Sequence, residues 1–118
     1  MSEAKKVKFP DIMRKPACEV ESDIPGLSGY MFQGPDGSQL ILWECEDRVE
    51  VQPHKHDFDE YCLVVEGVCE ETIEGETTKL VKGDEIVIPA GKMHWAVMGP
   101  HYRAIDYFGD ERVRYKNT

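Results

Sequence analysis

The chain has 118 residues, of which 41% are hydrophobic and 31% are charged, and its formal net charge is −9. This length suits one folded domain rather than two, and no apolar stretch is long enough to cross a bilayer. The N-terminus carries charges but lacks the apolar segment of a secretory signal, so we expect a cytoplasmic protein with no membrane partner.

The first element in chain order is a basic segment. Residues 1–16 carry five basic and two acidic side chains, a charge of +3, whereas the remaining residues carry nine basic and twenty-one acidic ones, a charge of −12. We interpret residues 1–20 as an N-terminal arm that is flexible or pairs with the sheet or with a partner subunit. Because the rest of the chain is acidic and repels polyanions, we expect no nucleic-acid partner.

Residues 21–118 read as one all-β domain. Helix signals are nearly absent, and short apolar segments alternate with turns rich in glycine and proline. The predicted strands span residues 40–43, 49–51, 61–65, 68–73, 77–81, 85–88, 94–98 and 102–108. Many short strands at such regular spacing are typical of a sandwich or barrel.

The strand at 61–65 is apolar on both faces. If Glu60 points into the barrel, Cys62 and Val64 do so too, and Tyr61 and Leu63 then point outward. A strand with two apolar faces is covered on both. We therefore expect a second sheet, a folded-over terminus or a partner subunit on the outside, and we predict a homodimer.

Four cysteines are present, at positions 18, 45, 62 and 69, and none forms a C-x-x-C pair. In a cytosolic protein this spacing favours free thiols that pack as small hydrophobic side chains. For the same reason we do not expect a cysteine zinc site.

The candidate metal ligands are concentrated in the segment from His54 to Glu60, and His94 adds a third imidazole. His54 and His56 are two residues apart, which on a β-strand places them on one face. Three imidazoles and one carboxylate are a donor set for one divalent transition metal, with Mn, Fe, Co, Ni, Cu and Zn as candidates.

The spacing of these residues forms two motifs. The first runs through His54, His56, Glu60 and Gly67, and the second through Gly83, Pro89, Gly91 and His94, with fifteen residues between them. The pair resembles the signatures of the cupin family, G-x5-H-x-H-x3-E-x6-G and G-x5-P-x-G-x2-H-x3-N. Arg48 replaces the first glycine and Met98 the final asparagine, and neither position is a metal ligand in the family.

The resemblance implies a single-domain cupin, an antiparallel jelly-roll β-barrel, in which His54, His56, Glu60 and His94 hold the metal. It implies a metal-dependent enzyme that acts on a small organic molecule by oxygenative cleavage, isomerisation or cyclisation. The alternative is a barrel that binds or senses a small ligand or a metal without catalysis, and a vestigial site is a third interpretation.

Other residues are candidates for contact with the small molecule. We interpret His101, which matches no ligand position, as a residue of the surface or the rim of the site. The candidates for an apolar pocket wall are Phe58, Met93, Trp95, Met98, Tyr102 and Tyr107.

Overall fold

The structure, a computed structural model, describes residues 8–109. In this part of the chain two 3-10 helices precede ten strands. They are η1 (Asp11–Met13), η2 (Pro16–Cys18), β1 (Glu19–Val20), β2 (Ser28–Gln33), β3 (Gln39–Glu44), β4 (Val49–His54), β5 (Glu60–Glu66), β6 (Cys69–Ile73), β7 (Glu76–Leu80), β8 (Glu85–Ile88), β9 (His94–Met98) and β10 (Arg103–Phe108). The predicted all-β class is confirmed.

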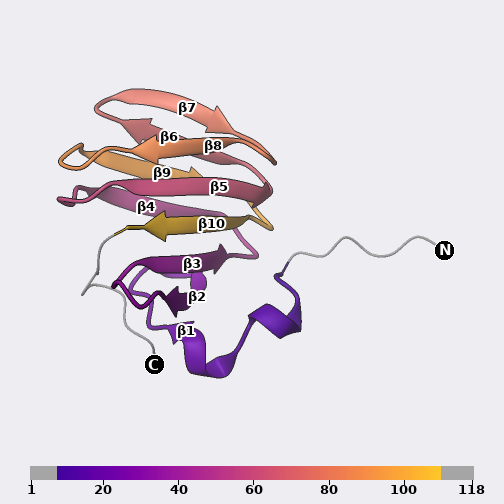
Figure 1. Cartoon of the computed structure of the whole chain (residues 1–118). Coiled ribbons are helices and arrows are strands. Elements are labelled where there is room, and N and C mark those ends of the chain that lie inside the picture. Colours follow the sequence, from indigo (N-terminus) through magenta and orange to yellow (C-terminus); the bar gives the residue numbers. More distant parts are fainter. Residues whose placement is uncertain (1–7, 110–118) are drawn as a thin grey trace.

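The strands form two antiparallel sheets that face each other (Figure 1). One sheet has the order β1-β2-β3-β10-β5-β8 and the other the order β4-β9-β6-β7. From β3 onward the chain passes back and forth between the sheets, since β4, β6, β7 and β9 belong to one and β5, β8 and β10 to the other. This is a jelly-roll arrangement, as the resemblance to the cupin family implied.

The predicted strands at 85–88 and 94–98 have the bounds of β8 and β9. The sequence analysis missed β1 and β2. The signal for β2 was the apolar run Tyr30-Met31-Phe32 between two glycines, which is short enough to be taken for part of a long connection.

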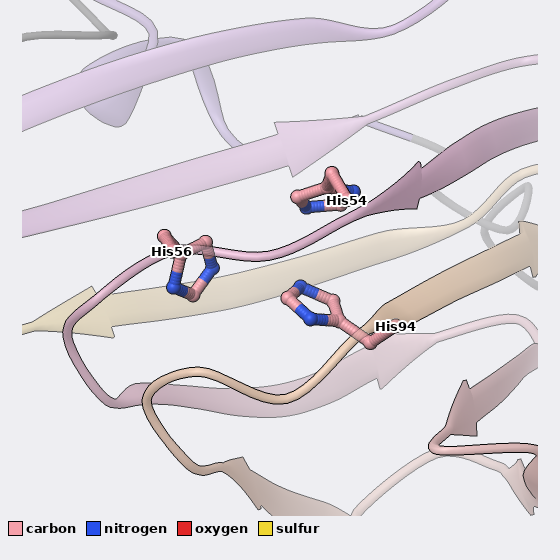
Figure 2. A group of neighbouring side chains, drawn as sticks. All are labelled: His54, His56 and His94. Atoms are coloured by element: carbon pink, nitrogen blue, oxygen red, sulfur yellow. The ribbon is translucent and has the colours of Figure 1, made fainter.

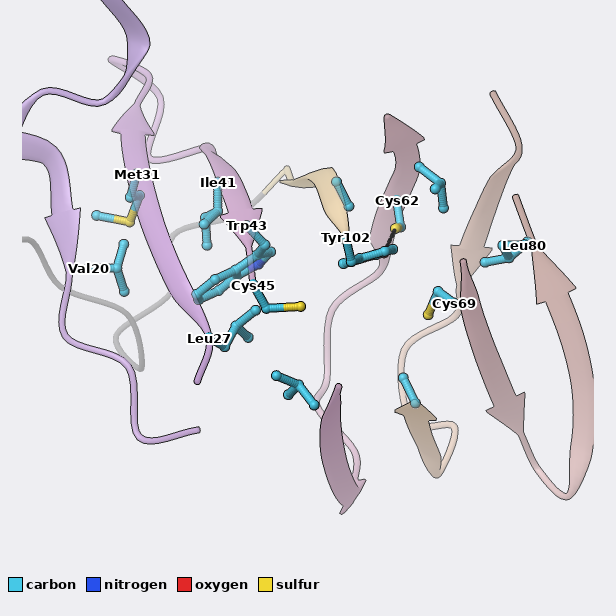
Figure 3. Packing of buried hydrophobic residues seen from close by; sticks show 14 of the residues in the cluster. Val20, Leu27, Met31, Ile41, Trp43, Cys45, Cys62, Cys69, Leu80 and Tyr102 are labelled. Carbon is cyan, nitrogen blue, oxygen red and sulfur yellow. Dashed lines mark hydrogen bonds between the residues drawn. The ribbon is translucent and has the colours of Figure 1, made fainter. Parts of the chain in front are cut away.

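The core lies between the two sheets (Figure 3). Cys62 and Val64 of β5 are buried there at 6% and 1% exposure, whereas Val65 packs in a second cluster around Phe9 and Leu42. The predicted alternation along β5 is therefore confirmed, and both faces of its sheet carry apolar side chains.

Residues 8–20 cover part of the outer face of the six-stranded sheet. The Phe9 amide and the Arg14 Nε each donate a hydrogen bond of 3.0 Å to the buried Glu44 carboxylate, and β1 pairs with β2. Residues 1–7 and 110–118 lie outside the described residues, so the division into an arm over 1–20 and a barrel over 21–118 stays a prediction.

The same outer face carries an uncovered row of side chains. Tyr107 on β10, Tyr61 on β5 and Val87 on β8 are paired in register across three neighbouring strands. Tyr107 and Val87 are 41% and 55% exposed. The outward position of Tyr107 corrects the sequence analysis, which placed this residue in the pocket wall. Tyr107 follows an inward-facing residue on β10 and therefore points outward.

The four cysteines are free thiols, and Cys45, Cys62 and Cys69 are buried. Burial raises the pKa of Cys69 to about 12 and that of Cys62 further. These thiols stay protonated near neutral pH and pack as hydrophobic side chains. Among the described residues no helix has the length and hydrophobicity needed to span a bilayer.

Candidate metal centre

Three histidines converge inside one end of the barrel (Figure 2). His54 ends β4 and pairs with His94, which begins β9. His56 lies in the loop after β4, which corrects the expectation of one strand for His54 and His56. Each of the three offers one ligand atom, and these atoms all lie within 4.8 Å of one another.

Local structure explains why the strand ends at His54. Pro53 is tolerated because β4 is an edge strand, and the register of β4 against β9 shifts between Val51 and His54. Beyond the strand, the His56 carbonyl accepts a 2.7 Å hydrogen bond from the amide of Gly91, whose φ of 79° favours glycine. This bond ties the two motifs together.

Each imidazole is oriented by a backbone carbonyl through its Nδ1 atom. The carbonyls belong to Gln52, Phe58 and Lys92, and each accepts at 2.9 Å from the histidine two residues away. A carbonyl can only accept, so Nδ1 carries the proton, and the unprotonated Nε2 of the neutral ring carries the lone pair that can bind a metal. Carbonyl contacts of this kind are the usual supports of metal-binding histidines.

Glu60 begins β5 and faces two of these imidazoles. Its Oε1 lies 3.1 Å from the His56 Nε2 and 3.8 Å from the His94 Nε2. Burial alone would raise the pKa of Glu60, but its close contacts with the His56 ring and with the Asp106 carboxyl group, and the charge of the nearby imidazoles when they are protonated, outweigh burial and lower that pKa. Because the neutral His56 Nε2 and the carboxylate are both acceptors, a proton or a cation must lie between them.

The buried His94 supports the same conclusion. Its side chain is 3% exposed, and its Nε2 atom has no hydrogen-bond partner among the described residues. A buried nitrogen lone pair without a partner is unfavourable. The three ligand atoms lie within 4.8 Å of one another, and imidazole nitrogens are ordinary ligands of divalent transition metals. The residues present therefore fit a divalent transition metal.

Asp106 is a site residue that the sequence analysis missed. It lies on β10 between the inward-facing Ala104 and Phe108 and forms a hydrogen bond with Glu60. Burial, followed by the charge and hydrogen bond of Glu60, raises the pKa of Asp106 well above its usual range. Asp106 therefore holds a proton that it donates to the Glu60 carboxylate. An acidic residue at an inward position of a strand was the available signal.

The histidines open into a cavity of about 50 Å³ between the sheets. Trp95, Met98 and Tyr102 line it, as expected of the pocket wall. Phe58 instead stacks on the His56 ring at 4.3 Å. Met93 is 37% exposed and does not line the cavity, which corrects its place in the wall. His101 is likewise exposed and outside it.

The family model for the cupin domain matches residues 42–98, which include all four predicted ligands. The chain belongs to the cupin family. The resemblance drawn from the two motifs is thus confirmed, and so is the fold it implied. A search of curated protein sequences finds no match to this cupin.

Solved structures similar to this cupin share the fold. KdgF from Halomonas sp. is 28% identical, with a TM-score of 0.72, and the match covers 80% of this chain and 87% of that one. An RmlC-like cupin from Shewanella frigidimarina is 23% identical, with a TM-score of 0.74 and coverage of 96% and 97%. Salicylate 1,2-dioxygenase from Pseudoaminobacter salicylatoxidans is 20% identical, with a TM-score of 0.65, and covers 74% of this chain and 26% of that one.

Proposed function

We propose that this cupin is an enzyme that binds one divalent transition metal and acts on a small organic molecule by oxygenative cleavage, isomerisation or cyclisation. His54, His56 and His94 would hold the metal through Nε2, with Glu60 as an anionic fourth ligand. The observation that carries the proposal is the orientation of all three imidazoles by carbonyls at 2.9 Å, which places the proton on Nδ1 and makes Nε2 the ligand atom of each neutral ring.

The residues around the metal position have distinct tasks. A divalent metal there would supply Lewis-acid activation of a carbonyl or water, or O2 binding in the case of iron. Glu60 contributes a negative charge, and the protonated Asp106 donates a hydrogen bond to it and so keeps it ionised. Trp95 and Met98 give the cavity apolar walls that favour a small organic ligand over water.

Metal content and turnover together test this proposal. Elemental analysis of protein purified without added metal is expected to find one transition metal per chain. The iron, manganese and nickel forms are then screened for turnover of small carbonyl, hydroxy and phenolic compounds. Stoichiometric metal without turnover of any compound would favour the alternative function, a barrel that binds or senses a ligand. A chain that binds none of the metals would contradict the proposed enzyme and would leave only the alternative in which the barrel binds a small ligand without a metal.

We expect metal affinity to fall as the pH drops below about 6.5, where protons compete with metals for imidazole nitrogens. Each histidine that must lose a proton adds up to about a tenfold loss per pH unit. Glu60 adds little to this dependence because its pKa is lowered. The measurement is a competition titration with a chelator of known affinity between pH 5 and pH 8.

His101→Ala is the control for this titration, because His101 is exposed and outside the cavity. This variant should show the same pH dependence as the parent. An affinity that is equal at pH 5 and pH 8 would exclude a histidine site.

We propose that a second copy of the chain covers the exposed row Tyr61, Val87 and Tyr107, because an apolar row across neighbouring strands is a typical contact between protomers. Light scattering at about tens of micromolar should therefore find a homodimer, given an interface of standard size. Val87→Lys should shift the protein toward monomer, since it places a charge in the contact.

The control for the dimer is Val81→Lys. Val81 is 43% exposed, close to the exposure of Val87, but it lies outside the row and outside the six-stranded sheet. This variant should keep the mass of the parent. A parent that scatters as a monomer would refute the dimer.

A further inference from the structure

A second acidic group lies inside the barrel and takes no part in the metal position described above. Glu71 on β6 is 7% exposed and lines the same cavity as the histidines. Its Oε2 atom is buried and has no hydrogen-bond partner among the described residues. The sequence analysis missed Glu71, which it read only as part of an alternating strand.

The neighbours of Glu71 do not account for its carboxyl group. It is paired with Ala96 of β9, and Ala96 is paired in turn with Val51 of β4. Ala96 and Val51 are apolar, and Thr78, the residue paired with Glu71 on β7, is exposed; none of them supplies a hydrogen bond to the buried Oε2. A buried polar group without a partner is unfavourable. A leucine at this position would serve the core better. The free-energy cost of burying this carboxyl group without a partner indicates that a molecule in the cavity supplies the missing hydrogen bond.

Sheet register places Glu71 close to the histidines. His94 is paired with Ile73, two residues along β6 from Glu71, so the two inward side chains are diagonal neighbours. Such neighbours on adjacent strands are about 7–8 Å apart at Cα. The small side chain of Ala96 leaves open the space beside them. One short molecule could thus contact a metal on the histidines at one end and Glu71 at the other.

The size of the cavity and the charge of Glu71 restrict that molecule. About 50 Å³ is room for only a few water molecules, given about 10–15 Å³ for each, so the ligand must be small. Burial, and then the Glu60 charge, raises the pKa of Glu71 to about 8. A protonated carboxyl both donates and accepts hydrogen bonds, as a hydroxyl does. An ionised carboxylate would still accept from a hydroxyl.

We propose that Glu71 binds a hydroxyl group of a small hydroxy acid whose carboxylate end lies at the histidines. This inference rests on the proposed function, because the metal on the histidines supplies the other anchor. Glu71 would then determine the preference for ligands that carry a further hydroxyl group, and Glu71 belongs to neither of the two sequence motifs.

The test uses the cobalt(II) form of the protein and two pairs of acids that differ in added hydroxyl groups. Lactate is compared with glycerate, and 2-hydroxybutanoate with erythronate, by titration of the cobalt absorption bands. The parent should bind the more hydroxylated member of at least one pair about tenfold more tightly. Glu71→Leu should lose this preference and bind the other member within about twofold of the parent.

Two further variants separate contact from general disturbance. Glu71→Gln keeps a hydrogen-bonding side chain and should retain part of the preference. Glu70→Gln is the matched control, since Glu70 is the adjacent carboxylate on β6 and is exposed; it should behave as the parent does. The metal-free Glu71→Leu protein should be at least as stable to heat as the parent, because it loses an unpaired buried group.

Each contrary result has one meaning. A parent that binds both members of both pairs equally, or neither, overturns the role of Glu71, as does a preference that survives in Glu71→Leu. A Glu71→Leu protein that is less stable than the parent and keeps its ligand affinities shows a structural role and overturns it too. Cobalt binding that His94→Ala does not weaken would refute the proposed function itself, and the assignment of Glu71 would fall with it.

Discussion

Glu60→Gln should bind a divalent metal more than about tenfold more weakly than the parent. Glutamine keeps nearly the same shape but removes the negative charge that lies 3.1 Å from the His56 Nε2. Changes one shell further out already cost roughly 10–100-fold in metal affinity, and the charge acts here in a poorly solvated barrel, where electrostatic terms are large. Metal stoichiometry and competition affinity are the measurements.

Asp57→Asn and Asp59→Asn are the controls for Glu60→Gln. Asp57 is exposed. Asp59 accepts a 2.8 Å hydrogen bond from the Ala90 amide, and asparagine can keep that bond through its own oxygen. Both variants should leave metal content nearly unchanged. If Glu60→Gln bound metal as the parent does while an aspartate variant lost it, the assignment of Glu60 would be wrong.

The metal-free protein should become less stable as the pH rises from about 5 to 8, in part because of Glu71. Its pKa is raised to about 8 by burial and by the charge of Glu60, whereas in the unfolded chain it is about 4.3. Between these values the folded state holds a proton that the unfolded state releases, so the free energy of unfolding falls with rising pH. The full loss from this one group is about 3–5 kcal/mol.

Glu71→Gln cannot titrate and should remove this part of the loss. Denaturant unfolding of metal-free protein at pH 5 and pH 8.5 measures it as the difference between parent and variant. Asp106 has a raised pKa as well, and the charge of Glu71 is one of its causes, so the difference between the two proteins reports Glu71 together with its effect on Asp106. Glu70→Gln should follow the parent. If the free energy of unfolding fell equally in the parent and in Glu71→Gln between these pH values, Glu71 would not titrate in this range.

Features that depend on neighbours in the chain could be predicted from the sequence. The bounds of β8 and β9 follow from short apolar runs between turns that contain Gly83, Gly91 and Gly99. The inward direction of Cys62 and Val64 follows from the two-residue period of a strand. The spacing of His54, His56, Glu60 and His94 indicated the cupin family, and the family model matches residues 42–98, which contain all four residues.

The strand that contains Tyr30 and the position of His56 illustrate the limit of local patterns. β2 is only six residues long and is held by pairing with β3, which no local pattern specifies. His56 leaves the line of β4 because the Gly91 amide, 35 positions away, bonds to its carbonyl. A period of two therefore placed His54 on a strand but failed for the residue two positions later.

The sequence by itself determined the fold class, the family and the four candidate ligands, because strand alternation, turns and motif spacing are properties of neighbouring residues. Only the tertiary structure decided which further groups face those ligands. Asp106 contacts Glu60 because β10 lies between β3 and β5, and Glu71 faces the cavity because β6 lies beside β9. Sheet order is set by packing between distant segments, and the environment of a buried carboxyl, and hence its pKa, is set by that packing.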